Sequence, residues 1–171
     1  MNTTLFFLRS SEQKIAYNIL PYALALDENP PILNVYTSDY GFKSSDVGIY
    51  SQTDNVVSAA AWMRLYKQSD GVCGYVDDVT PVLVIGVIPD VRGNGVGSLI
   101  IDQLLQEAAV IYEQISVSVR SNSREVKFYE QLGFVPLIDS EQIDILIMIK
   151  KLEKKAITRP TDGYDPRRWM D

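Results

Sequence analysis

Residues 81–98 read PVLVIGVIPDVRGNGVGS, and this stretch decides the fold expected for the chain. Residues 81–88 are almost entirely apolar, which is typical of a β-strand covered on both faces. Three alternate glycines follow and predict a sharp turn, because glycine adopts backbone conformations that other residues avoid. From Ser98 to Glu113 apolar residues recur at helical spacing. The stretch therefore predicts a strand, a glycine-rich turn and a helix in succession.

Working outward, residues 115–120 (ISVSVR) predict a second strand. It completes a β–α–β unit, whose two strands should be parallel. Further strands are expected at 4–8, 47–51, 56–66, 134–138 and 143–150. Helices are expected at 12–26, interrupted by Pro21, and at 124–132, ended by Gly133; a loop with a short helix is expected at 27–46. The prediction is one α/β (α+β) domain over residues 1–150, with a mixed, mostly antiparallel sheet flanked by helices, and a charged tail over 151–171.

The glycine-rich turn is a candidate phosphate site. The first N–H groups of a helix have no intrahelical partner, and with the helix dipole they favour an anion. Arg92 adds a charged donor, so we predict a pyrophosphate cradle at Arg92–Ser98. A P-loop would need a lysine where Ser98 stands, and a dinucleotide fingerprint would place its third glycine one residue later than Gly97. A tight turn without any ligand remains the structural alternative.

Two motifs together resemble the GCN5-related (GNAT) N-acetyltransferases. Arg92–Gly97 (RGNGVG) matches the family pattern [RQ]-x-x-G-x-[GA], and residues 122–134 (NSREVKFYEQLGF) are similar to its second signature, N-x-x-A-x-x-F-Y-x-x-x-G-F. The motifs occur in the family order, separated by a helix and a strand. The resemblance covers residues 81–135, with a matching strand and helix at 4–26. It implies a central sheet in which two parallel strands splay apart.

The resemblance also implies acetyl-CoA as cosubstrate and a role for each matching residue. The pantetheine arm would bind the backbone of Ile85, Gly86 and Val87. The pyrophosphate would bind Arg92 and the amides of Gly93, Asn94, Gly95, Val96, Gly97 and Ser98. Asn122 would contact the coenzyme arm, and Tyr129 would protonate the leaving thiolate, a plausible task for a phenol. Asn122 is also a good helix N-cap, and Tyr129 could be a core aromatic.

The chain departs from the family pattern in two respects. Glu125 stands where the pattern has a small residue, and neither 81–88 nor 115–120 contains a carboxylate that could deprotonate the substrate ammonium. Asp77 and Asp78 are the nearest candidates, with ordered water as the alternative. Cys73 is a weak candidate for an acyl-carrying nucleophile, because the chain has no histidine to activate it.

Composition excludes several classes of function. Without histidine there is no His-ligated metal site and no Ser-His-Asp triad, and no metal is expected. Residues 1–149 hold nine Lys/Arg and eighteen Asp/Glu, which argues against nucleic-acid binding and suits a cationic substrate. No apolar run is long enough to cross a membrane, no signal peptide is recognised, and a single cysteine fits the cytoplasm.

The acceptor is expected to be a small-molecule amine or a protein amino group. Its pocket would come from residues 20–45 and the last strands, lined by Tyr22, Tyr36, Tyr40, Phe42 and Trp62. The tail is expected to pack across the domain, to pack on the partner subunit of a homodimer, or to be disordered. Two other functions stay open: a non-catalytic acyl-CoA-binding sensor, and a phosphate binder unrelated to coenzyme A.

Overall fold

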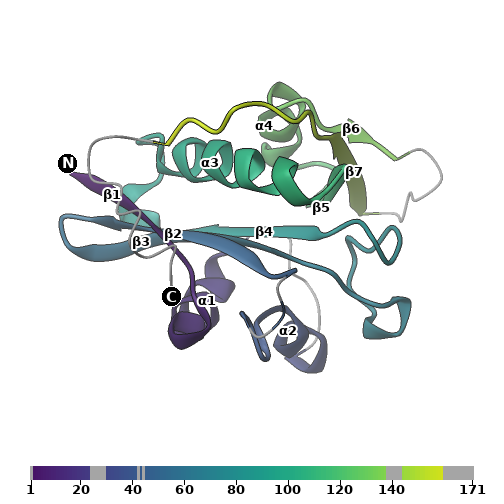
Figure 1. Cartoon of the computed structure of the whole chain (residues 1–171), viewed down its shortest axis with the longest axis horizontal. Helices are drawn as coiled ribbons and strands as arrows, with labels where there is room; N and C mark the ends of the chain where they lie inside the picture. The colour runs from purple at the N-terminus through teal and green to yellow at the C-terminus, as the bar shows by residue number, and fades with distance from the viewer. Residues whose placement is uncertain (1, 24–29, 42, 44, 138–143, 160–171) are drawn as a thin grey trace.

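The computed structural model describes residues 2–23, 30–41, 43, 45–137 and 144–159, with the backbone alone for residues 30–33. Seven strands form one sheet in the order β1-β2-β3-β4-β5-β7-β6 (Figure 1). The strands are β1 (Thr3–Phe7), β2 (Val47–Thr53), β3 (Val56–Arg64), β4 (Val82–Val87), β5 (Gln114–Arg120), β6 (Val135–Pro136) and β7 (Ile145–Lys151). All neighbours pair antiparallel except β4 and β5, which confirms the mixed, mostly antiparallel sheet.

Helices cover both faces of this sheet. The α-helices are α1 (Gln13–Ile19), α2 (Pro30–Thr37), α3 (Val96–Ile111) and α4 (Glu125–Gln131), and the 3₁₀ turns are η1 (Ser10–Glu12), η2 (Leu20–Tyr22), η3 (Gln68–Asp70) and η4 (Pro89–Val91). α3 and α4 lie on one face, and α1 and α2 on the other (Figure 1). The helix expected over 12–26 is shorter, because Pro21 falls in η2 and the chain is extended again at Ala23; residues 24–26 lie outside the described part.

The parallel pair is the feature that creates a site. β4 and β5 share one register pair, Val82 with Ser116, supported by a 3.0 Å bond from the Ser116 N–H to the Pro81 carbonyl. β4 is held by β3 along its whole length and β5 by β7, so each strand follows its own half of the sheet. The strands diverge beyond the pair, as the family resemblance implied. The sheet opens into a V whose apex lies at Val82.

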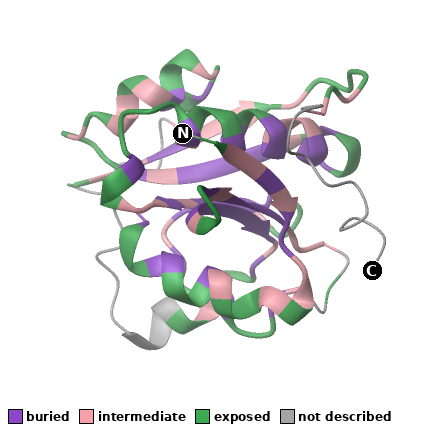
Figure 2. Ribbon diagram, turned by 90° about the vertical axis from the view of Figure 1, so that its left-hand side faces the viewer, coloured by how far each residue is buried: buried purple, intermediate pink, exposed green. Residues whose placement is uncertain are grey.

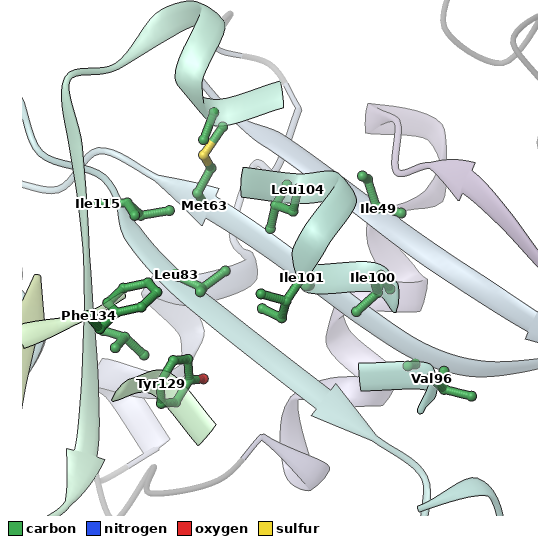
Figure 3. Packing of buried hydrophobic residues seen from close by; sticks show 14 of the residues in the cluster. Ile49, Met63, Leu83, Val96, Ile100, Ile101, Leu104, Ile115, Tyr129 and Phe134 are labelled. Atoms are coloured by element: carbon green, nitrogen blue, oxygen red, sulfur yellow. The ribbon is translucent and has the colours of Figure 1, made fainter. Parts of the chain in front are cut away.

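The core is divided between the two faces of the sheet. On the α3 face, Ile100, Ile101 and Leu104 pack against Met63 and Leu83 (Figure 3). On the α1 and α2 face, a second cluster is rich in aromatic side chains, among them Tyr36, Tyr40 and Trp62. Figure 2 shows the buried residues concentrated on the strands between the helical layers. Alternation along β3 sends Met63 to the first cluster and Trp62 to the second.

Side chains of β3 fix the end of α2. The Trp62 indole donates to the Tyr36 carbonyl at 2.9 Å, and Arg64 donates to the carbonyls of Val35 (3.0 Å) and Ser38 (2.7 Å). Arg64 also forms a 3.1 Å ion pair with Asp46, whose side chain is 1% exposed. One guanidinium thus satisfies the final carbonyls of α2 and the buried carboxylate that follows it. These contacts lock Tyr36 in place.

Replacing Arg64 by Met should destabilise the protein by about 3–5 kcal/mol, because Asp46 would stay buried without a cation. Urea unfolding measures this change, and Lys14→Met on the exposed side of α1 is the matched control, expected within about 0.5 kcal/mol of the parent. Equal stability of the two variants would contradict the anchoring role.

The first part of the tail packs across the domain. After β7 the chain runs back along α3 (Figure 1), with the Leu152 N–H donating to the Glu113 carbonyl at 2.8 Å and the Thr158 N–H to Gln106 Oε1 at 2.7 Å. Arg159 then forms a 3.1 Å ion pair with Glu107, whose side chain is 2% exposed. Of the three expectations for the tail, packing across the domain is observed through Arg159; the remaining residues, 160–171, lie outside the described part.

Replacing Arg159 by Met should lower the free energy of unfolding by about 1–3 kcal/mol, because Glu107 would keep its burial and lose its cation. Adding Glu107→Gln should recover part of that loss. Lys155→Met is the control, since Lys155 and its partner Glu153 are both largely exposed. A melting temperature of Arg159→Met equal to that of Lys155→Met would show that residues 152–159, the strap along α3, contribute no stability.

Candidate active site

A cleft of about 520 Å³ fills the V between β4 and β5. Its walls come from β4, the glycine-rich turn, the start of α3, the end of β5 and the start of α4. Ala23, Tyr22 and Tyr36 line it from the opposite face of the sheet. The cleft therefore runs through the sheet, from the α3 and α4 side to the α1 and α2 side.

Nine of the twelve residues predicted for the site line this cleft. They are Ile85, Val87, Arg92, Gly93, Gly95, Val96, Gly97, Ser98 and Tyr129. The other three, Gly86, Asn94 and Asn122, do not line it, although each is next to a residue or turn that does. The structure thus brings the two sequence motifs to opposite walls of one cavity.

The turn before α3 presents unpaired amides. Gly93 and Gly95 have φ angles of 82° and 79°, where a side chain would be strained, and a Cβ on either would meet open space. Helix α3 begins at Val96, and its first intrahelical bond runs from the Leu99 N–H to the Gly95 carbonyl at 3.0 Å. No N–H from residue 93 to residue 98 donates to another described residue. These amides are free to bind an anion.

Two polar side chains shape the same turn. Arg92 folds back so that its Nε donates to the Val87 carbonyl at 3.0 Å, which keeps an exposed guanidinium at the mouth of the cleft. The Asn94 side chain donates to the Val91 carbonyl at 3.2 Å. Asn94 therefore braces the turn with its side chain, while its amide belongs to the unpaired series.

The edge of β4 that does not pair with β5 faces the cleft through alternate residues, and an isolated antiparallel bridge joins Gly86 to Ala23 on this side. The Ile88 N–H donates to the Ser58 carbonyl at 2.9 Å and Gly86 pairs with Ala60, so the polar backbone groups of Gly86 face β3. Those of Ile85 and Val87 then face the opposite way, into the cleft. Gly86 serves a different need: a Cβ there would lie 2.6 Å from Ile19 Cγ2 and 2.8 Å from the Ile19 carbonyl oxygen. The backbone at Ile19 therefore approaches β4 closely, and only glycine fits at position 86.

Tyr129 stands on the opposite wall, between the diverging strands (Figure 3). Its side chain is 4% exposed and packs edge-to-face on Phe128 and Phe134, each with ring centroids 5.2 Å away. Burial, and to a lesser extent the charge of Glu125, raises the pKa of the Tyr129 phenol well above its usual range. The hydroxyl is therefore protonated at neutral pH and has a proton to donate.

Asn122 lies in the exposed turn that precedes α4. The N-cap position of this helix is Arg124, two residues later, and the cap makes no side-chain hydrogen bond. The structure thus does not show Asn122 capping the helix. Its contact with the coenzyme arm stays a prediction.

Glu125 is the only carboxylate among the described residues that line the cleft. Asp77 and Asp78, the expected candidates for a base, lie elsewhere: Asp77 accepts the Val79 N–H at 2.9 Å and Asp78 accepts the Tyr75 hydroxyl. Cys73 does not line the cleft either. Sequence reasoning missed Ser118, Arg120, Ser123 and Arg124, which do line it. Alternation of Ser and Val along residues 115–120 was a signal for Ser118, because Ser116 and Ser118 share one face of β5.

Only some of the aromatic residues expected around the acceptor reach the cleft. Tyr22 and Tyr36 line it, although Tyr36 is only 1% exposed and belongs to the same buried cluster as Tyr40 and Trp62, which do not line the cleft. Phe42 lies outside the described residues. No group of three or more potential metal ligands occurs in the described part of the chain, and no described helix is long and apolar enough to cross a bilayer.

Comparison with solved structures shows where this architecture recurs. The ribosomal-protein-S18-alanine N-acetyltransferase of Escherichia coli matches with a TM-score of 0.64 and 19% identity, over 92% of this chain and 99% of that one. A phosphinothricin acetyltransferase of the GNAT superfamily from Sinorhizobium meliloti, solved with acetyl-CoA, gives 0.64 and 17%, over 97% of both chains. A GNAT-family acetyltransferase from Streptococcus pneumoniae gives 0.64 and 12%, over 89% of this chain and 100% of that one. These identities establish the fold alone.

The family itself is established by sequence. A search of curated protein sequences finds no significant match. The family model described as "Acetyltransferase (GNAT) domain", however, matches residues 49–136, slightly more than half of the chain and inclusive of both motifs and the whole V. The chain belongs to the GNAT acetyltransferase family.

Proposed function

We propose that this protein is an N-acetyltransferase, which transfers the acetyl group of acetyl-CoA to a primary amine by direct attack of the amine on the thioester. One observation carries the proposal: the unpaired amides of residues 93–98 continue into the part of β4 that does not pair with β5, and both face Tyr129 across a single cleft. The arrangement offers anion binding, backbone pairing and an acid in that order along one path. We place the reaction in the cytoplasm, because a chain with a single cysteine cannot form an intrachain disulfide and suits a reducing compartment.

The cleft fits the chemistry of acetyl-CoA from end to end. The amides of residues 93–98, with the Arg92 guanidinium beside them, would hold the pyrophosphate. The backbone groups of Ile85 and Val87 would pair with the amides of the pantetheine arm, as an added strand pairs with a sheet edge. Asn122 would contact the arm from the turn before α4. The cavity falls in the range of ordinary small-ligand sites.

The residues around Tyr129 support the transfer of the acetyl group. The neutral amine nitrogen forms a bond to the thioester carbonyl carbon, and a backbone N–H of the splayed strand β4 would polarise the carbonyl oxygen. As the carbon–sulfur bond breaks, Tyr129 donates its proton to the departing thiolate, which leaves as the free thiol. The proton released by the amine passes to water in the cleft, because Asp77 and Asp78 are too far removed to take it.

The acceptor is expected to enter from the α1 and α2 face, where Tyr22 and Tyr36 line the cleft. Aromatic rings attract ammonium groups through cation–π contact, and the acidic body of the protein raises the local concentration of cations. The similar proteins named above act on a protein alanine in one case and on phosphinothricin in another. Both a protein amino group and a small amine therefore remain within the proposal.

A non-catalytic acyl-CoA sensor is the second candidate. The observation in its favour is that no carboxylate on β4 or β5 faces the cleft, so the described residues offer no conventional base for the amine. Such a sensor would use the same amides and strand edge and would not need the Tyr129 hydroxyl.

Replacing Tyr129 by Phe separates the two candidates. Turnover with an accepted amine, measured as release of coenzyme A thiol, should fall about 100-fold or more, because the acid is lost while the ring stays. The calorimetric Kd for acetyl-CoA should change little. Tyr17→Phe, at an exposed position on α1, is the control and should retain full activity. Undiminished turnover in Tyr129→Phe would exclude the acid role, and loss of acetyl-CoA binding would reduce Tyr129 to a packing residue.

Replacing Gly95 by Ala tests the cradle, and Gly71→Ala is a closely matched control. Both glycines have positive φ angles and open space around the missing Cβ, but Gly71 does not line the cleft. Both variants should lose about 1 kcal/mol of stability from backbone strain.

Only Gly95→Ala should lose the rise in melting temperature that acetyl-CoA gives the parent protein, because its methyl group obstructs the free amides. ATP and NAD should give the parent a much smaller rise. Equal responses of Gly95→Ala and Gly71→Ala to acetyl-CoA would contradict the cradle.

A further inference from the structure

We propose that Glu125 determines which acyl groups this enzyme accepts, by excluding thioesters whose acyl chain carries a negative charge. The inference rests on the proposed function, because it assumes that a coenzyme A thioester occupies the cleft. It goes beyond that function in naming the class of acyl donor, which is neutral, and the residue that selects it.

The placement of Glu125 is the first support. Glu125 and Tyr129 are one helical turn apart on α4, so their side chains share a face, and both line the cleft. The carboxylate is partly buried and makes no hydrogen bond or ion pair with another described residue. A glutamate at the start of a helix is favourable wherever it points. Here Glu125 lines the cleft, so a ligand that fills the cleft comes close to its negative charge.

The charges around the cleft make Glu125 the uncompensated one. Three arginines, Arg92, Arg120 and Arg124, line the cleft and are exposed. The phosphates of a bound coenzyme A would neutralise the cations that they contact, and the coenzyme arm itself is neutral. Glu125 then faces a part of the cleft from which the ligand has displaced water.

The reach of this charge includes the reacting end of the thioester. Glu125 already acts on the Tyr129 phenol, where its charge adds to the effect of burial in raising the pKa. If the thioester sulfur lies at that phenol, a carboxylate on a short acyl chain enters the cleft that Glu125 lines, where salt screens the two charges less than in bulk solution. Repulsion between like charges is stronger in a cleft that has lost its water than in bulk solution. Neutral acyl chains of the same length escape this penalty.

Calorimetry with butyryl-CoA and succinyl-CoA tests the inference, because both acyl chains have four carbons and only succinyl is anionic. The parent protein should bind butyryl-CoA at least about tenfold more tightly. In Glu125→Gln, which keeps the size of the side chain, the ratio should fall to within about threefold, mainly through tighter binding of succinyl-CoA. Glu130→Gln, on an exposed position of the same helix, should keep the parent ratio.

The outcomes distinguish a failure of the role of Glu125 from a failure of the proposed acetyltransferase function. Equal binding of both thioesters by the parent, or an unchanged ratio in Glu125→Gln, would overturn the role of Glu125 and leave the acetyltransferase proposal standing. Binding of neither thioester would overturn both. Should Glu125→Gln fail to fold, the ratio is measured in Glu125→Ala, which carries the small residue of the family pattern at this position. A ratio in Glu125→Ala equal to that of the parent would then contradict the inference.

Discussion

The whole site depends on one missing interaction, the pairing of β4 with β5 beyond Val82 and Ser116. Each strand is held firmly on its other side, β4 by β3 and β5 by β7, so neither can turn toward the other. The unsatisfied edge of β4 would be costly if it were sealed in the protein interior. It is tolerated because it opens onto a cleft that water or a ligand can enter. The same divergence brings α3 and α4 to opposite walls and allows the cleft to cross the sheet.

Two further features turn this opening into a directional site. Positive φ angles at Gly93 and Gly95 release a series of amides at the start of α3, and we propose that an anion binds at this end of the cleft. Tyr129, buried between two aromatic rings with its proton retained, marks the other end. The contacts of Arg64 and Trp62 with α2 fix Tyr36 on the acceptor side, far from both motifs in sequence. The strap of residues 152–159 is attached to α3 by the ion pair between Arg159 and Glu107, a buried residue of that helix.

The local part of this architecture could be predicted from the sequence. Residues 81–120 carry their own signals, an apolar run, glycines and helical periodicity, and the β–α–β unit that they predict is confirmed. The splaying of its strands could not be obtained from those residues, because it results from the commitment of β4 and β5 to partners elsewhere in the chain; only the family resemblance implied it. The same non-local packing places Tyr36 in the cleft and Trp62 in the core, although both are aromatic residues of neighbouring elements. It also places Asp77 and Asp78 outside the cleft, where their sequence position beside β4 suggested the reverse. Gly86 shows why such packing cannot be predicted locally. The glycine is visible in the sequence, but Ile19, whose backbone leaves no room for a Cβ at that position, is 67 positions away.

Amide hydrogen exchange, followed residue by residue with and without saturating acetyl-CoA, tests the central claim most directly. In the free protein the amides of residues 93–98, with that of Ile85, should exchange rapidly. The amide of Gly86, paired with β3, should be protected throughout and serves as an internal reference. Acetyl-CoA should slow exchange at the cradle and at the β4 edge together. Amides at residues 93–98 that are already protected in the free protein, or that exchange equally fast with the ligand bound, would contradict the account.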